Sequence, residues 1–300
     1  ETGIPAELVS MPLTGATAPV TLLGAITQHA AENLSGVVIH QLAGPGSPII
    51  YGGSPAAFDM RHGTTPMGAI ETMMLDCANA EVGKRLGLPT QGYIALSDAK
   101  LLDAQAGLET GIGAVLAALS GINSVSGPGM LDFESCLSLE KLVLDNEICG
   151  MTERLVAGIE PRDDFPAGPL LEELQRDHHL LIADHTLRHL RAEISFPGPV
   201  IDRANRSRWR SEGERTLGQR AAAVQRDFAT GADDRVGRLT LLGEPGGAVG
   251  DGRAVEQPEG VGDQGGDRHH LVGVVNVTGI DLIDYLDSSI PQHAFSTHGE

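Results

Sequence analysis

Asp98 and Lys100 are the residues whose types and position point most directly to chemistry. They follow the apolar run at 93–96, which predicts a β-strand. In sheets of parallel strands, the groups that act on a ligand gather at the carboxyl ends of the strands. Asp98 and Lys100 could therefore contact a charged substrate or organise its pocket, and we take both as candidate catalytic residues. The alternative is that Asp98 only caps a helix and that Lys100 is a solvated residue of its first turn.

Three further residues are candidates for binding a substrate. Tyr51 ends the apolar run at 48–50 and could offer its ring face or hydroxyl group, or it could be a core tyrosine. Asp59 and Arg61 carry opposite charges two residues apart, so they could hold a substrate or form a salt bridge within a loop.

Histidines gather in one later segment, at 178–189. His185 and His189 are four residues apart and would share one helical face, which suits zinc chelation. Thr186 stands where the zinc-protease motif HExxH needs glutamate. A zinc-dependent hydrolase using this cluster is therefore an alternative function, although ordinary helix-surface histidines are the more common case and we predict no metal site.

The elements that must position these residues alternate between strands and helices. A parallel sheet covered by helices is typical of this alternation, and an open sheet and a barrel both satisfy it. No GxGxxG follows a strand, which argues against a dinucleotide fold. The expected strands are 6–10, 36–40, 93–96 and 122–125, with an extended piece at 48–51, and the expected helices are 19–33, 66–85, 98–119 and 138–157.

The character of the chain changes near residue 229. Residues 160–228 predict charged helices, whereas glycine and aspartate dominate 229–268, which is typical of a linker or disordered segment. A strand at 271–277 and a short helix at 280–286 are further expectations. We therefore expect one domain over 1–228 and an irregular tail over 229–300.

Composition excludes several function classes. The formal net charge of −19 argues against a nucleic-acid binder and could draw cations into a cleft. No apolar run reaches the roughly 18 residues of a membrane helix, so we expect no membrane span. The three cysteines form no CxxC pair, which fits a reducing compartment, and we expect a cytoplasmic protein.

A set of short motifs, in order and spacing, resembles the trimethylamine/glycine betaine corrinoid methyltransferase family over residues 3 to about 228. Each motif is weak alone, and together they are fairly specific. They lie at 11–21, 45–53, 59–63, 97–100, 103–107, 138–145, 179–181, 185–187 and 199–203, with Trp209 after them.

The resemblance implies the later βα units of a TIM (β/α) barrel, with the opening strands missing. It implies methyl transfer from a methylated or quaternary amine to the Co(I) corrinoid of a partner protein, with no cofactor bound by this chain itself. No pyrrolysine is written in the sequence, which favours the non-pyrrolysine branch of the family. A homo-oligomer is a further expectation, and an inactive barrel fragment is an alternative.

Two of the matching positions bear on the substrate. His179 and His185 match positions that the betaine enzymes use to contact substrate, so we take His179 as catalytic and His185 as substrate-binding. A betaine cage would have aromatic side chains at the positions of His185 and Leu187. Their absence, with only 3% aromatic residues, argues against glycine betaine as the substrate.

Overall fold

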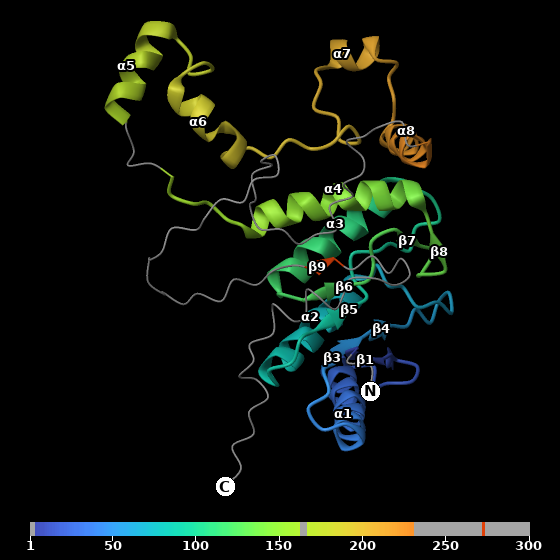
Figure 1. Ribbon diagram of the computed structural model, residues 1–300. Coiled ribbons are helices and arrows are strands. Elements are labelled where there is room, and N and C mark those ends of the chain that lie inside the picture. Colours follow the sequence, from blue (N-terminus) through green and yellow to red (C-terminus); the bar gives the residue numbers. More distant parts are fainter. Residues whose placement is uncertain (1–3, 163–166, 231–271, 274–300) are drawn as a thin grey trace.

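Parallel strands with helices between them form the centre of the molecule (Figure 1). The computed structural model describes residues 4–162, 167–230 and 272–273. Strand β1 (Ala6–Ser10) pairs in parallel with β3 (Ile49–Gly53), and β5 (Gln91–Gly92) pairs in parallel with β6 (Ser124–Val125). A parallel bridge between Tyr51 and Thr90 joins the two pairs, so the strand order follows the sequence.

Four helices alternate with these strands, and all three adjacent pairs of helices are in contact. They are α1 (Leu22–Ala43), α2 (Ile70–Arg85), α3 (Ala104–Leu119) and α4 (Leu139–Val156), and each packs on the next. The main core lies between α2, α3, α4 and the strands, and includes Ile94, Ile122 and Leu144. Within the described ranges, no helix combines the length and the apolar character needed to cross a membrane.

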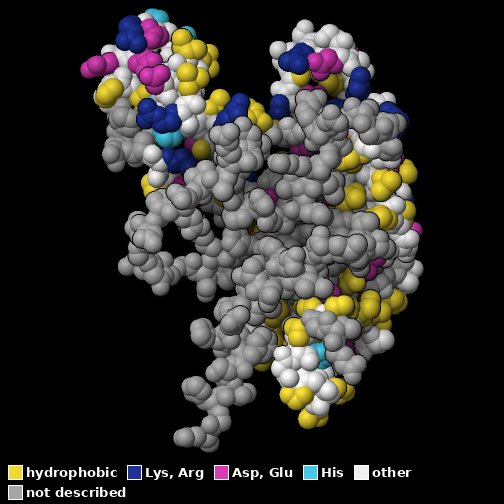
Figure 2. All heavy atoms as spheres, viewed as in Figure 1, with side chains coloured by type: hydrophobic (Ala, Val, Ile, Leu, Met, Phe, Trp, Pro, Cys, Tyr) yellow, Lys and Arg dark blue, Asp and Glu magenta, His cyan; other side chains and the backbone are white. Residues whose placement is uncertain are grey.

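Short strands lie just past the ends of the long ones, and further helices follow. Strand β2 (Leu13–Thr14) pairs with β4 (Ala56–Ala57), and β7 (Met130–Leu131) forms an antiparallel hairpin with β8 (Cys136–Leu137); β9 (Val272–Gly273) pairs with β6. The remaining helices are α5 (Ala167–Asp177), α6 (Asp184–Glu193), α7 (Arg206–Ser211) and α8 (Leu217–Thr230), of which α8 packs on α4. Helices α5 and α6 stand away from the sheet (Figure 1), and charged side chains gather on them (Figure 2).

The expected strand at 36–40 is wrong, because these residues belong to α1. The β-branched run Val37-Val38-Ile39 favours a strand locally, but the helix continues through it. Gly36 lets α1 lie directly on β1, since a Cβ there would be 2.9 Å from a methyl group of Leu8.

Other element boundaries are confirmed or shifted. The helix expected at 138–157 is confirmed as α4, which Ser138 caps through its hydroxyl group, and Gly87 follows α2 with φ of +72°. The strand expected at 93–96 lies two residues earlier, and α3 begins later than expected. Asp103 caps α3, because its carboxylate accepts hydrogen bonds from Gln105 N–H and Ala106 N–H. Asp98 is therefore not the cap of this helix.

The described residues form a mixed α/β structure with no closed sheet. Of the expected strand at 271–277, the described part is β9. The irregular segment at 229–268, beyond the end of α8, and the short helix at 280–286 lie outside the described residues.

Candidate functional site

The segments that leave the parallel strands meet at their carboxyl ends, and we call this region the strand-end cluster. Ser97 N–H donates to the Met130 carbonyl over 3.3 Å, and Asp132 N–H donates to the Ala99 carbonyl over 3.0 Å, so the segment after β5 docks on the β7–β8 hairpin. An apolar wall accompanies them, formed by Leu13, Ala56, Met67, Tyr93, Leu96 and Met130.

Asp98 lies inside this cluster and is only 7% exposed. Its two carboxylate oxygens accept hydrogen bonds from Met67 N–H at 2.8 Å and Gly68 N–H at 3.0 Å. Burial raises the pKa of Asp98, and the Gly68 N–H opposes that rise. Gly68 leaves room for the contact, since a Cβ there would be 2.6 Å from the Glu109 carboxylate and 3.2 Å from that of Asp98.

Glu109 of α3 binds the loop that carries Asp98. Its carboxylate accepts from the Ser97 hydroxyl group at 2.5 Å and from Asp98 N–H at 2.9 Å. Its other oxygen accepts from the Gln105 side chain at 2.9 Å. The first helical turns of α3 therefore fix the loop, and Glu109 is a positioning group for Asp98.

The loop of the β7–β8 hairpin is strained and carries a buried acid. Asp132, Phe133 and Glu134 have φ values of 50°, 54° and 71° in succession, a conformation that costs about 1–3 kcal/mol for each such residue. Strain of this kind persists where surrounding contacts impose it, and it concentrates at functional sites. Glu134 is the residue that this strained loop turns toward the cluster.

The Glu134 carboxyl group has one buried oxygen atom, Oε1, that has no hydrogen-bond partner among the described residues. Burial, and then the negative charge of Asp98, raise the pKa of Glu134 from 4.5 to about 7. Glu134 in turn adds to the effect of burial on Asp76, a buried carboxyl group of α2 whose pKa lies well above its ordinary value.

Lys100 ties the two halves of the cluster together. Its Nζ donates to the Asp98 carbonyl at 2.7 Å, lies 3.5 Å from Asp132 Oδ1 and stands 3.8 Å from the centre of the Phe133 ring. These contacts hold the strained loop against the segment after β5. The strand-end cluster thus contains Asp98 and Lys100, two of the predicted candidates, and also Glu134, which the sequence analysis missed.

The predicted substrate-binding residues Tyr51, Asp59 and Arg61 lie in two other places. Tyr51 is fully buried against α1 and α2, with its ring centre 6.0 Å from that of His29, and burial raises its pKa. Asp59 accepts from Arg61 at two atoms, over 3.0 and 2.7 Å, in an exposed turn. The Arg61 guanidinium holds the pKa of Asp59 far below its ordinary range, so this pair forms the loop salt bridge given as the alternative.

His179 and His185 lie at the α5–α6 region, away from the strand-end cluster (Figure 1). His179 is exposed before α6, and His185 lies in the first turn of that helix. The rings of His185 and His189 are 4.8 Å apart, which confirms that they share a face. However, no group of three or more His, Cys, Asp or Glu within the described ranges could hold a metal ion, so the zinc hydrolase is not supported.

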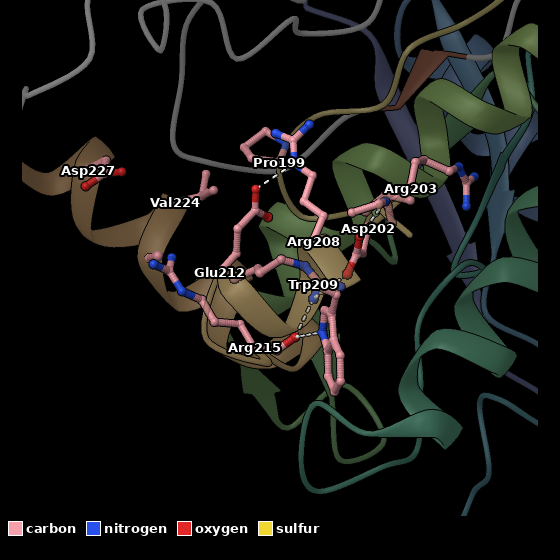
Figure 3. Close-up of a pocket in the computed structure, with 13 residues that line it drawn as sticks. Pro199, Asp202, Arg203, Arg208, Trp209, Glu212, Arg215, Val224 and Asp227 are labelled. Atoms are coloured by element: carbon pink, nitrogen blue, oxygen red, sulfur yellow. Dashed lines mark hydrogen bonds and ion pairs between the residues drawn. The ribbon is translucent and has the colours of Figure 1, made fainter. Parts of the chain in front are cut away.

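A separate cavity of about 650 Å³ lies between residues 199–204, α7 and α8 (Figure 3). Trp209 forms one wall, and its indole N–H donates to the Arg215 carbonyl at 3.1 Å. Arg208 pairs with Glu212 over 2.7 Å across the same helix. The cavity contains matched motif positions but none of the predicted catalytic or substrate-binding residues, and its charges are largely paired with one another.

Comparisons with known proteins agree with the resemblance. Residues 1–232 match the family described as trimethylamine methyltransferase (MTTB). A trimethylamine methyltransferase of Methanosarcina thermophila is 36% identical over 72% of this chain and 44% of its own length. A trimethylamine methyltransferase of Desulfitobacterium hafniense is 32% identical over 73% of this chain and 44% of its own length.

The match extends to a relative that acts on another substrate. A glycine betaine methyltransferase of Desulfitobacterium hafniense is 33% identical over 74% of this chain and 46% of its own length. The chain spans less than half the length of these relatives. Because the family match covers more than half of the chain, the chain belongs to the trimethylamine methyltransferase family.

Proposed function

We propose that this chain binds a methylated amine cation at the strand-end cluster and presents one of its methyl groups to the Co(I) corrinoid of a partner protein. The observation that carries the proposal is the buried, unpaired Oε1 of Glu134 beside the carboxylate of Asp98. Membership of the family supports the reaction class, and the names of the relatives support a methylated amine as the substrate.

The cluster has the two properties that such a cation needs. Opposite charges about 4 Å apart attract by about 4 kcal/mol at an effective dielectric constant of 20, so Glu134 can offset the desolvation of the cation. Met67, Met130 and Tyr93 give the N-methyl groups an apolar wall that excludes water. A protonated tertiary amine could also donate its N–H to Glu134, whereas a quaternary amine would contribute charge alone.

The corrinoid supplies the nucleophile when its partner protein presents it. Lys100 in the strand-end cluster is engaged by the Asp98 carbonyl and Asp132, and the other groups named there are carboxylates and apolar side chains, which suit the amine rather than the corrinoid. In the proposed reaction this chain therefore binds the amine, orients a methyl group outward and keeps water from the ammonium centre. An acidic cluster also disfavours the carboxylate of a betaine, in line with the missing aromatic cage.

The remaining parts of the proposal rest on coarser support. The parallel strand order and the site at the carboxyl ends of the strands are typical of a TIM barrel, so we propose that the chain forms part of one. All three cysteines are free, which supports a reducing compartment, and we place the protein in the cytoplasm. The predicted roles of Tyr51, His179 and His185 remain proposals, and so does a homo-oligomer.

Methyl transfer to the cognate corrinoid protein tests this function. The corrinoid is reduced to Co(I), and the loss of its absorbance is followed with trimethylamine or glycine betaine as the donor. We expect loss with trimethylamine, at least about tenfold slower for Glu134→Gln because the cation loses its charged partner. Glu81→Gln, an exposed carboxylate of α2 paired with Arg85, is the matched control. No Co(I) loss with either donor would contradict the proposal.

The zinc-hydrolase and inactive-fragment alternatives gain no support. Zinc analysis of the purified chain bears on the first, and we expect well under one zinc per chain because the histidine pair lacks a third ligand among the described residues. The transfer assay bears on the second, since an inactive fragment would leave Co(I) unchanged with every donor.

A further inference from the structure

The motif at 138–145 contains a buried ion pair that the proposed reaction does not use. Lys141 and Asp145 lie four residues apart on α4, and both side chains are 0% exposed. Lys141 Nζ is 2.5 Å from Asp145 Oδ2 and donates to the Thr110 hydroxyl group on α3 at 2.8 Å. Well-packed apolar residues often replace such a pair without loss of stability, so stability alone does not account for it.

The pair reaches out of its helix to the root of the β7–β8 hairpin. The same Asp145 Oδ2 accepts a hydrogen bond from Gly129 N–H at 2.6 Å. The Gly129 carbonyl accepts from Ser138 N–H at 3.0 Å, so both backbone groups of this residue are held by α4 and its cap. Gly129 has φ of +89°, and a Cβ there would be 2.8 Å from Leu137, so the backbone geometry at this point requires glycine.

Gly129 directly precedes β7, and the hairpin carries Glu134 at its other end. The tip of the hairpin is held by Asp132 N–H on the Ala99 carbonyl and by Lys100. Its root is held by Asp145. Two anchor points therefore impose the strained conformation at 132–134, and losing the root anchor would let the loop relax.

We infer that Asp145, held in place by Lys141, is the positioning residue that fixes the hairpin root and thereby places the Glu134 carboxylate in the strand-end cluster. The importance of this placement for the amine rests on the proposed function, whereas the anchoring itself does not. Neither residue touches the substrate.

Two double variants separate the anchor from the ion pair. Lys141→Met/Asp145→Leu removes the charges and the acceptor for Gly129 N–H, while Lys141→Met/Asp145→Asn removes the charges but keeps an acceptor. Thr152→Val is the matched control, because it removes a buried hydroxyl group that bonds within α4, to the Ile148 carbonyl. The readouts are amide hydrogen exchange of residues 130–137 and the carboxyl ¹³C titration of Glu134, assigned by its absence in Glu134→Gln.

We expect Lys141→Met/Asp145→Leu to lower protection of the hairpin amides by at least about tenfold, while α3 keeps its protection. The titration midpoint of Glu134 should move from about 7 toward 4.5, since a released carboxyl group is hydrated. Compared with the Leu variant, the Asn variant should recover most of the hairpin protection and most of the rise in the Glu134 midpoint. Thr152→Val should change neither quantity. A folded Leu variant with unchanged hairpin protection and unchanged titration would overturn the inference.

Two other outcomes are also decisive. If the Leu variant does not fold, the Asn variant decides, because its uncharged acceptor holds Gly129 N–H less strongly than the carboxylate does. A small loss of protection confined to the hairpin supports the inference, and no loss, or a loss spread equally over α3, α4 and the hairpin, overturns it. Trimethylamine titrated into the same samples separates the two proposals. If the wild-type chain binds no amine, but the Glu134 titration midpoint differs between wild type and the Leu variant, the proposed function is refuted and the inferred anchor stands.

Discussion

Replacing Glu134 by glutamine should stabilise the protein at alkaline pH. The ionised carboxylate is unfavourable where it stands, because it is partly buried and lies near the negative charge of Asp98. Glutamine has nearly the same shape and carries no charge. Glu134 therefore costs stability at alkaline pH, a cost that functional groups often carry, and the proposed cation site accounts for its presence.

The magnitude follows from the pKa of Glu134. A rise from 4.5 to about 7 corresponds to about 3 kcal/mol for a fully buried group. The carboxyl group is partly exposed to solvent, so we reduce this to about 1–2 kcal/mol. The folded state binds the proton more tightly than the unfolded state, so stability falls as pH rises from 4.5 through about 7 and stays low above it.

Urea unfolding of wild type and Glu134→Gln tests this reasoning. At about pH 8.5 the variant should be more stable by about 1–2 kcal/mol, and at about pH 5.7 the advantage should shrink to about half. Saturating trimethylamine should narrow the gap at alkaline pH, because the cation stabilises only the wild-type carboxylate. A variant that is equally or less stable at pH 8.5, or one whose advantage grows toward acid, would refute the reasoning.

Substitutions at three other positions test the geometry around the site. Gly127→Ala should destabilise the fold by more than about 3 kcal/mol in urea unfolding, because the new Cβ would be 2.0 Å from the Ile94 carbonyl oxygen. A loss of stability under about 1 kcal/mol would contradict this packing. Gly107→Ala, with nothing within 4 Å, is its control and should be neutral or slightly stabilising. Asp103→Ala should cost about 1 kcal/mol through loss of the α3 cap, and Asp103→Asn should recover most of it, whereas equal effects of the two would argue against capping.

Local signals in the sequence located most of the elements. The run at 6–10 and the helical patterns at 66–85 and 138–157 are local signals, and the structure confirms a strand at the first and helices at the other two. The strand expected at 36–40 failed because its β-branched residues favour a strand, while packing of Gly36 on β1 supports a continuous helix. The strand preference of these residues is overridden by the contact of α1 with β1, and that contact cannot be read from the sequence alone.

The candidate site was predictable only in part. Asp98 and Lys100 follow a strand, and this position made them candidates. Glu134 gave no such signal, because its left-handed backbone would ordinarily call for glycine or asparagine, and the segment 132–134 contains neither. Its conformation depends on anchors more than ten residues away at Asp145 and more than thirty away at Lys100, contacts that only the fold reveals.

Calorimetric titration of trimethylamine into the chain tests the central claim most directly. The proposed site predicts saturable binding whose affinity rises as pH increases through about 7, as Glu134 ionises, and is at least about tenfold weaker in Glu134→Gln at alkaline pH. Glu81→Gln should bind as wild type does. Binding that is unchanged by both pH and Glu134→Gln, or no binding at all at alkaline pH, would contradict the account.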